Sequence, residues 1–166
     1  AYSIPALEHS TATLNIQMYR KALVIADAIT EEELTDDKDV SAILAEKLDL
    51  PKKVVDAAYL PALQVRDLLM IQGKTPEQIE LAVGETFTIA RMLVEVYPNR
   101  TFAYVSDSYN YKRVISIILP ALYDVIMIHN GKLVIRPDSG NPVEIVCGIE
   151  GADISNEVSK AISEHP

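Results

Sequence analysis

The sequence contains a single cysteine, Cys147, among its 166 residues. One cysteine cannot form an internal disulfide, so a disulfide-stapled secreted scaffold is excluded and a reducing compartment, the cytoplasm, is expected. A chain of this length can bury a core that is stable without cross-links. We therefore expect one soluble globular domain over residues 1–166.

Long apolar runs and clusters of basic residues are also missing. The most apolar segment, RVISIILPALYDVIMIH, is interrupted by Pro120 and Asp124 and lacks the unbroken length of a membrane span. The first residues, AYSIPALEHS, lack the features of a secretory signal, and a chain that opens on Ala1 is expected to be a piece of a longer protein. With a net charge of −9 the chain offers no basic field for nucleic acid, whereas a local site for a small phosphate ligand remains compatible with it.

Helical periodicity dominates residues 13–97. The first predicted helix begins at Thr13, and its apolar face consists of Leu14, Met18, Ala22, Ile25 and Ile29. The acidic run at 31–37 is interpreted as a solvated loop, and a second helix follows over 40–48. Residues 52–72 predict one or two helices, broken near Pro61 and ended by Gly73. The segment Thr75-Pro76-Glu77-Gln78 is a typical helix start, and that helix closes at 97–99.

Three segments, at 2–7, 101–106 and 132–136, are predicted to be strands. Strands that alternate with helices indicate an α/β fold with a parallel sheet. In such folds the carboxyl ends of the strands carry the site. The three strands end in the polar clusters Glu8-His9-Ser10, Ser106-Asp107-Ser108 and Arg136-Asp138-Ser139-Gly140. We expect these clusters to share one crevice.

Two of the clusters leave both functional and structural interpretations open. His9 could act as a general acid/base, a phosphate contact or a nucleophile, or it could simply hydrogen-bond to Glu8 at a strand end. Asp107 could stabilise developing positive charge or hold a ribose hydroxyl, or it could cap the next helix.

The third cluster is ambiguous in the same way. Arg136 and Asp138 could form an internal ion pair, or Arg136 could take phosphate oxygens while Asp138 faces a sugar or a cation. The run Ser139-Gly140-Asn141 predicts either a plain β-turn or a nest of backbone N–H groups for an anion.

The remaining residues of chemical interest are assigned structural roles. Cys147 lies in an apolar stretch and is expected in the core. His129 and His165 are expected on the solvated surface. The three histidines share no ligand spacing, so no metal site held by the protein is expected.

The segments SIPALEHST, YVSDSY and GKLVIRPDSGNP, in this order, resemble the nicotinate/nicotinamide (type II) phosphoribosyltransferase family. LPALYDVIM before GKLVIRPDSG is most similar to its bacterial and phage-type members. The resemblance covers residues 1 to about 13 and about 84 to 155. It implies an incomplete (βα) barrel and the transfer of phosphoribose from 5-phosphoribosyl 1-pyrophosphate to nicotinamide, giving nicotinamide mononucleotide and pyrophosphate. Mg²⁺ would enter with the pyrophosphate substrate, and ATP is a further cofactor that the resemblance implies.

The resemblance also implies roles for individual residues. His9 matches the family histidine that contacts pyrophosphate and can be phosphorylated by ATP, and Glu8 would orient it. Arg136 matches the arginine that contacts nucleotide and pyrophosphate. The residues that would line the nicotinamide and ribosyl pocket are Asp138, Asp107 and Ser3, and Ser139 and Gly140 would join the phosphate contacts.

Residues 14–83 depart from the family, whose members have only a short link there. We expect this helical insertion to be a lid or an oligomer contact, since loops on the catalytic face of a barrel accept insertions. The family enzymes are homodimers with the site at the interface, so a homodimer or larger oligomer is implied. Two alternatives stay open: an inert nucleotide-binding, phosphate-binding or assembly module, and nicotinate as the base.

Overall fold

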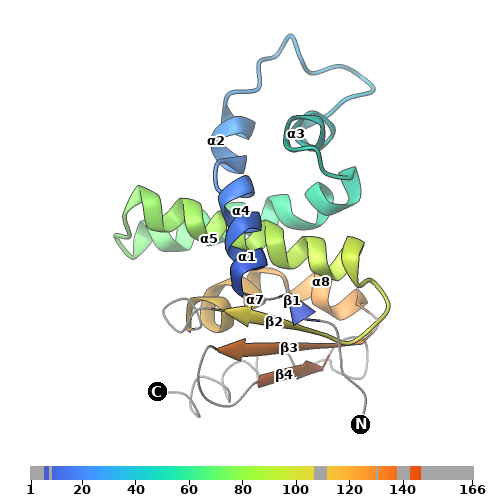
Figure 1. The fold of residues 1–166 in the computed structure, drawn as a ribbon. Coiled ribbons are helices and arrows are strands. Elements are labelled where there is room, and N and C mark those ends of the chain that lie inside the picture. Colours follow the sequence, from blue (N-terminus) through green and yellow to red (C-terminus); the bar gives the residue numbers. More distant parts are fainter. Residues whose placement is uncertain (1–5, 8, 107–111, 130, 138–142, 147–166) are drawn as a thin grey trace.

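The computed structural model describes residues 6–7, 9–106, 112–129, 131–137 and 143–146. Within these ranges the chain is a mixed α/β protein in which a helical layer accompanies a four-stranded sheet. In Figure 1 the strands occupy the lower part of the molecule, and the loop before α3 (Val40–Leu48) lies at the opposite, upper end.

The sheet has the strand order β1-β2-β3-β4. Its strands are β1 (Ala6–Leu7), β2 (Phe102–Ser106), β3 (Lys132–Pro137) and β4 (Val143–Val146). β1 pairs parallel with β2, and β2 pairs parallel with β3, so the predicted parallel arrangement is confirmed for these three strands.

The expectation of a purely parallel sheet was wrong for β4, which runs antiparallel to β3 and had not been predicted at all. Only residues 138–142 separate the two strands in sequence. A link of this length allows a hairpin-like return, whereas a parallel neighbour needs a crossover of a dozen residues or more. Chain length between the strands therefore decides the direction.

The helical part before β2 contains five α-helices and a π-helix. They are α1 (His9–Tyr19), α2 (Ala22–Asp27), α3, α4 (Lys52–Ile71), α5 (Pro76–Arg91) and η1 (Met92–Val96). α4 continues through Pro61, so one helix forms where one or two had been considered. At the start of α5, Thr75 and Gln78 form the predicted capping box. The segment between β2 and β3 forms η2 (Val114–Ile118), α7 (Leu119–Ala121) and α8 (Tyr123–Ile128).

The predicted inward face of the first helix was wrong at Leu14 and Met18, while Ala22 is buried and Ile25 and Ile29 pack against the core. Leu14 is 67% exposed and Met18 is 62% exposed, whereas Ile16 and Tyr19 are buried. The pattern had been read as one continuous helix, but the chain breaks at Arg20 between α1 and α2. A break resets the helical phase, so residues before and after it no longer lie on one continuous face.

One hydrophobic core joins the helices to the sheet. α5 lies at its centre, because every residue from Ala82 to Ala90 is buried. Phe87 of α5 and Val65 of α4 belong to the same buried cluster as Phe102 of β2. Residues 14–83 are thus packed into the core that also holds the strands. The acidic run at 31–37 is exposed, as predicted.

His129 was expected at the surface, but it is buried, with 4% of its area exposed. Its ring nitrogens lie 3.2 Å from the carbonyl oxygen of Leu93 and 3.1 Å from that of Arg100. The ring also packs against Phe102, with the two rings perpendicular and their centroids 5.5 Å apart. His129 thus packs at the end of α8 against the segment before β2, a contact that local sequence does not reveal.

Candidate active site

The carboxyl ends of β1, β2 and β3 lie along one edge of the sheet, because the three strands are parallel. Ser106 pairs with Pro137, so β2 and β3 end level with each other. β1 ends at Leu7, opposite Tyr104 of β2. The predicted shared edge is therefore confirmed at the level of the backbone.

Two of the predicted site residues have a described backbone position at or near this edge. His9 is the first residue of α1 and follows β1 after a single residue. Arg136 is the next-to-last residue of β3 and pairs with Val105. The others lie outside the described residues: Ser3, Glu8, Asp107, Asp138, Ser139 and Gly140. In sequence, Glu8, Asp107 and Asp138 each follow directly after the last residue of β1, β2 and β3.

The helix that begins at His9 is held in place by a close approach to α5. A Cβ atom on Gly84 would lie 2.3 Å from the carbonyl oxygen of Ile16 and 3.1 Å from the amide nitrogen of Arg20. Glycine is therefore required for the backbones of α1 and α5 to come this near. This contact helps to set where α1, and with it His9, stands relative to the sheet.

Polar contacts reinforce the α1–α5 packing at both ends. Arg91 of α5 donates to the side-chain oxygen of Asn15 at 2.9 Å and to the hydroxyl of Tyr19 at 3.3 Å. Burial raises the pKa of Tyr19, and the nearby positive charge of Arg91 partly offsets this effect. At the other end, Glu80 accepts from Arg20 at 3.0 Å and from Lys21. The contacts with Lys21, and then with Arg20, lower the pKa of the Glu80 carboxyl.

Glu85 is a buried acid that pairs with strand β2. Glu85 of α5 is 2% exposed and accepts a hydrogen bond of 2.7 Å from the hydroxyl of Tyr104, which is fully buried in β2. Burial raises the pKa of Tyr104 well above its ordinary value, and the adjacent Glu85 raises it further. Because Tyr104 lies two residues before the end of β2, this bond ties α5 to the strand that leads to the predicted site.

These supporting residues were missed by sequence reasoning, which concentrated on polar residues at strand ends. One signal was available for Glu85, since it is the only charged residue in the sequence from Leu81 to Ala90. A carboxylate within such a stretch is expected to be buried and paired. No comparable local signal marked Asn15 or Arg91.

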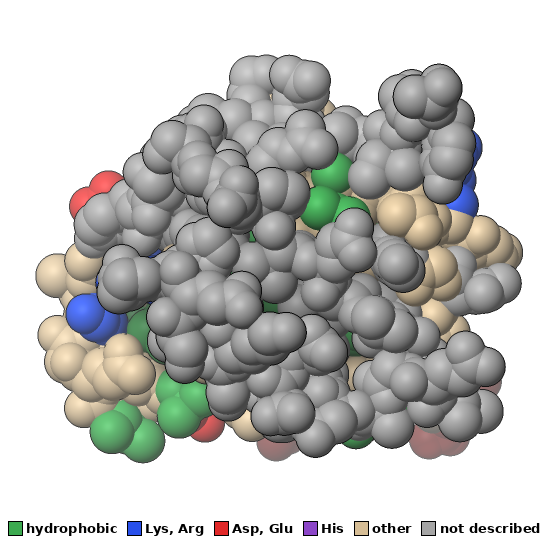
Figure 2. All heavy atoms as spheres, turned by 90° about the horizontal axis from the view of Figure 1, so that it is seen from below, with side chains coloured by type: hydrophobic (Ala, Val, Ile, Leu, Met, Phe, Trp, Pro, Cys, Tyr) green, Lys and Arg blue, Asp and Glu red, His purple; other side chains and the backbone are tan. Residues whose placement is uncertain are grey.

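Two features are absent from the described residues. These residues contain no group of three or more His, Cys, Asp or Glu side chains placed to hold a metal ion. None of their helices combines the length and apolar character needed to cross a membrane. In the view from below, the charged side chains that are described lie scattered at the margin and form no patch of one sign (Figure 2).

Two curated proteins match parts of the chain. The nicotinamide phosphoribosyltransferase of Mycoplasma pneumoniae is 42% identical over 64 residues, which cover 39% of this chain and 14% of that protein. The nicotinamide phosphoribosyltransferase of Acinetobacter baylyi is 36% identical over 76 residues, which cover 42% of this chain and 15% of that protein. No family model matches, and no solved structure matches.

The comparisons confirm the resemblance that the motifs indicated, over part of the chain. The chain spans only 14–15% of the length of the curated relatives it matches. Each match also leaves more than half of this chain without a counterpart. The activity of a complete enzyme is therefore a proposal for this chain, and it is argued below.

Proposed function

We propose that this chain contributes to phosphoribosyl transfer from 5-phosphoribosyl 1-pyrophosphate to nicotinamide, a step of NAD biosynthesis, in the cytoplasm. The observation that carries the proposal is that β1, β2 and β3 are parallel and end at one edge of the sheet. In sequence, each of these strands leads into one of the three family-like motifs. The similarity to two nicotinamide phosphoribosyltransferases supports it.

The proposed roles follow from the charge that develops during the reaction. As the bond between ribose and pyrophosphate breaks, the sugar becomes positive and the leaving group carries negative charge. His9 and Arg136, with Ser139 and Gly140, would bind the phosphates, and Glu8 would orient His9. Asp107 and Asp138 would stabilise the positive sugar, and Ser3 would line the base pocket. Mg²⁺ would arrive with the pyrophosphate substrate, and ATP would act through His9.

The architecture of the complete protein belongs to the same proposal. The three parallel strands would form part of a barrel-like sheet, and the site would be completed in a homodimer or larger homo-oligomer. Residues 14–83 would serve as a lid or an oligomer contact. The exposed side chains of Leu14 and Met18 on α1 support a contact of this kind.

A second candidate is a module that binds a nucleotide or phosphate without turnover. The short span of the match favours it, since the chain corresponds to 14–15% of each relative. Nicotinate in place of nicotinamide is the nearby enzymatic alternative.

The deciding experiment measures nicotinamide mononucleotide formation from nicotinamide, phosphoribosyl pyrophosphate and Mg²⁺. Wild-type chain, His9→Ala and Arg136→Ala are compared, with a parallel series in which nicotinate replaces nicotinamide. We expect each substitution to reduce turnover by about a hundredfold or more, because it removes a charge-assisted contact to the leaving group. Arg66→Ala is the matched control and should leave turnover unchanged, since this partly exposed arginine of α4 pairs only with Asp27 and Asp67 among the ion pairs found for the described residues.

Turnover that is equal in the wild type and both variants would refute the assigned roles. Saturable binding of nicotinamide mononucleotide by a folded wild-type chain without turnover would select the binding module. Product formation with nicotinate alone would select the other base.

A further inference from the structure

A cavity of about 510 Å³ opens between α4, η1 and α8. Its described lining consists of Lys53, Asp56, Ala57, Val94, Asp124, Val125 and Ile128. A smaller cavity of about 240 Å³ adjoins it along α4, because the two share Asp56, Ala57, Asp124 and Val125. No lining residue of the larger cavity was among the predicted site residues.

Apolar side chains from three elements form much of this lining. Val125 of α8 is buried, and Ala57 of α4 and Val94 of η1 are partly buried and pack against the core. Ile128, the last residue of α8, is 80% exposed. An apolar group bound against these residues would remove the side chain of Ile128 from water, which is favourable.

The charged residues of the lining differ in whether they are already paired. Asp56 accepts from the ammonium of Lys52, with 3.1 Å between the two atoms. Lys53 and Asp124, in contrast, form no ion pair or side-chain hydrogen bond with any residue that the structure describes. Lys53 belongs to α4 and Asp124 to α8, so one unpaired cation and one unpaired carboxylate line the cavity from two different helices.

This pair of charges favours a ligand that carries both signs. A cation would be attracted by Asp124 and repelled by Lys53, and an anion would meet the reverse. A zwitterion can place its ammonium near Asp124 and its carboxylate near Lys53, and both contacts are then charge-assisted.

We infer that this cavity binds an amino acid with a large apolar side chain. Its ammonium is held by Asp124, its carboxylate by Lys53, and its side chain lies against Ala57, Val94 and Ile128. The volume of about 510 Å³ falls within the range of roughly 300–1,000 Å³ typical of small-molecule sites, which are mostly apolar with a few polar groups. The inference does not rest on the proposed phosphoribosyl transfer, and its test measures binding rather than turnover.

The test is an NMR titration of the isotope-labelled 166-residue chain with phenylalanine at neutral pH and low ionic strength, where charges are weakly screened. We expect saturable shifts of the backbone amide signals of Ala57 and Val125, which line the cavity. The dissociation constant should rise about tenfold in Asp124→Asn and in Lys53→Gln, because each variant loses a charge-assisted contact.

Analogues that each lack one recognised group are titrated in parallel. Phenethylamine lacks the carboxylate, phenylpropionate lacks the ammonium, and the amino acid alanine lacks the phenyl ring. Each analogue should bind more weakly than phenylalanine.

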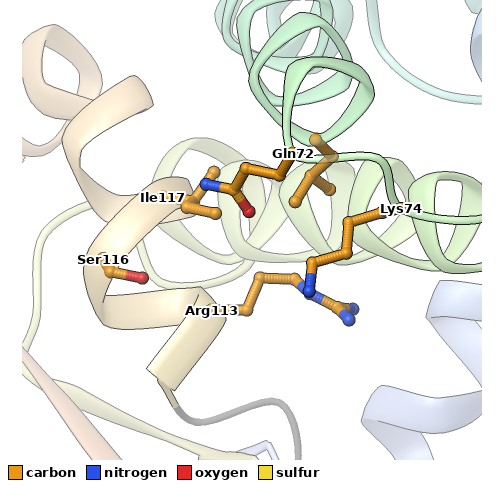
Figure 3. A pocket seen from close by; sticks show the side chains of 6 residues that line it. Gln72, Lys74, Arg113, Ser116 and Ile117 are labelled. Carbon is orange, nitrogen blue, oxygen red and sulfur yellow. The ribbon is translucent and has the colours of Figure 1, made fainter.

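Two matched controls remove the same charges elsewhere and should leave binding unchanged. Lys74→Gln changes an exposed lysine that lines a separate cavity, between the end of α4 and η2 (Figure 3). Asp37→Asn changes an exposed acid of the run at 31–37.

The inference is overturned if the shifts do not saturate, or if they are absent from Ala57 and Val125. It is also overturned if a control weakens binding as much as Asp124→Asn or Lys53→Gln does. An analogue that binds as tightly as phenylalanine would likewise overturn it, because the group which that analogue lacks would then play no part in recognition.

Discussion

At the scale of single residues, His129 connects parts of the chain that are distant in sequence. Its ring nitrogens contact the carbonyl oxygens of Leu93 in η1 and Arg100 before β2, while the ring packs on Phe102. Burial lowers the pKa of His129, and the two carbonyl contacts partly counter this effect. The net direction means that the folded chain binds a proton on this ring less readily than the unfolded chain does.

The stability of the fold is therefore expected to decrease as pH falls through the ordinary histidine pKa of 6.5. Below that pH the unfolded chain takes up a proton that the folded chain, with its lowered pKa, does not yet bind, and unfolding is favoured. Above it, both states are neutral at this ring and the contribution is fully present. Urea unfolding midpoints of wild type and His129→Gln between about pH 7 and pH 5 measure the effect.

The decisive quantity in that experiment is the difference in slope between the two proteins. His129→Gln should lower stability at neutral pH but show a shallower loss toward acid. An equal slope in both would mean that His129 does not contribute to the pH dependence.

At the scale of elements, the packing of α1 on α5 depends on Gly84. Alanine in the interior of a helix ordinarily stabilises it by about 1 kcal/mol relative to glycine. Here the added Cβ would meet the backbone oxygen of Ile16 at 2.3 Å, and a backbone atom cannot swing aside as a side chain can. The two helices would have to separate.

We expect Gly84→Ala to lower the free energy of unfolding by about 3 kcal/mol or more, because of this overpacking. Gly73→Ala is the comparison, since its Cβ would have no atom within 4 Å but its φ of 74° strains any other residue. That strain should cost only about 1 kcal/mol. Denaturant unfolding of both variants gives the two values, and a Gly84→Ala protein as stable as wild type would contradict the close approach.

The helices and strands also show which features local sequence patterns can predict. The bounds of α3, the capped start of α5 and the strands β2 and β3 were predicted, because periodicity and capping involve residues only a few positions apart. The inward face of α1 was not, since the break at Arg20 and the contact with Gly84 depend on packing between helices. The same holds for the burial of His129 and for β4.

At the scale of the whole molecule, residues 14–83 are continuous with the rest of the fold. α1, α4 and α5 share one buried cluster with β2 and β3. In Figure 1, α4 and α5 lie between α3 and the strands. Residues 14–83 supply about half of the buried cluster. Their deletion therefore tests the stability of the whole fold as well as the role of the proposed insertion.

Deletion of residues 14–83 is expected to abolish cooperative folding, since it removes α4 and most of α1 and exposes the buried faces of β2 and β3. The control replaces the exposed run at 31–37 with a Gly/Ser linker of equal length, which should leave the thermal transition nearly unchanged. Circular dichroism during thermal unfolding distinguishes the two. A deletion variant that unfolds in one sharp transition would show that the segment is a separable unit.

For the candidate site, too, the sequence predicted some features and only the tertiary structure decided others. Strand periodicity was enough to predict that three strands end at one sheet edge, because parallel pairing places all carboxyl ends together. The bond between Glu85 and Tyr104 and the contact of Gly84 with Ile16 join residues far apart in sequence. Local patterns carry no information on such distant contacts, so only the packed chain could decide them.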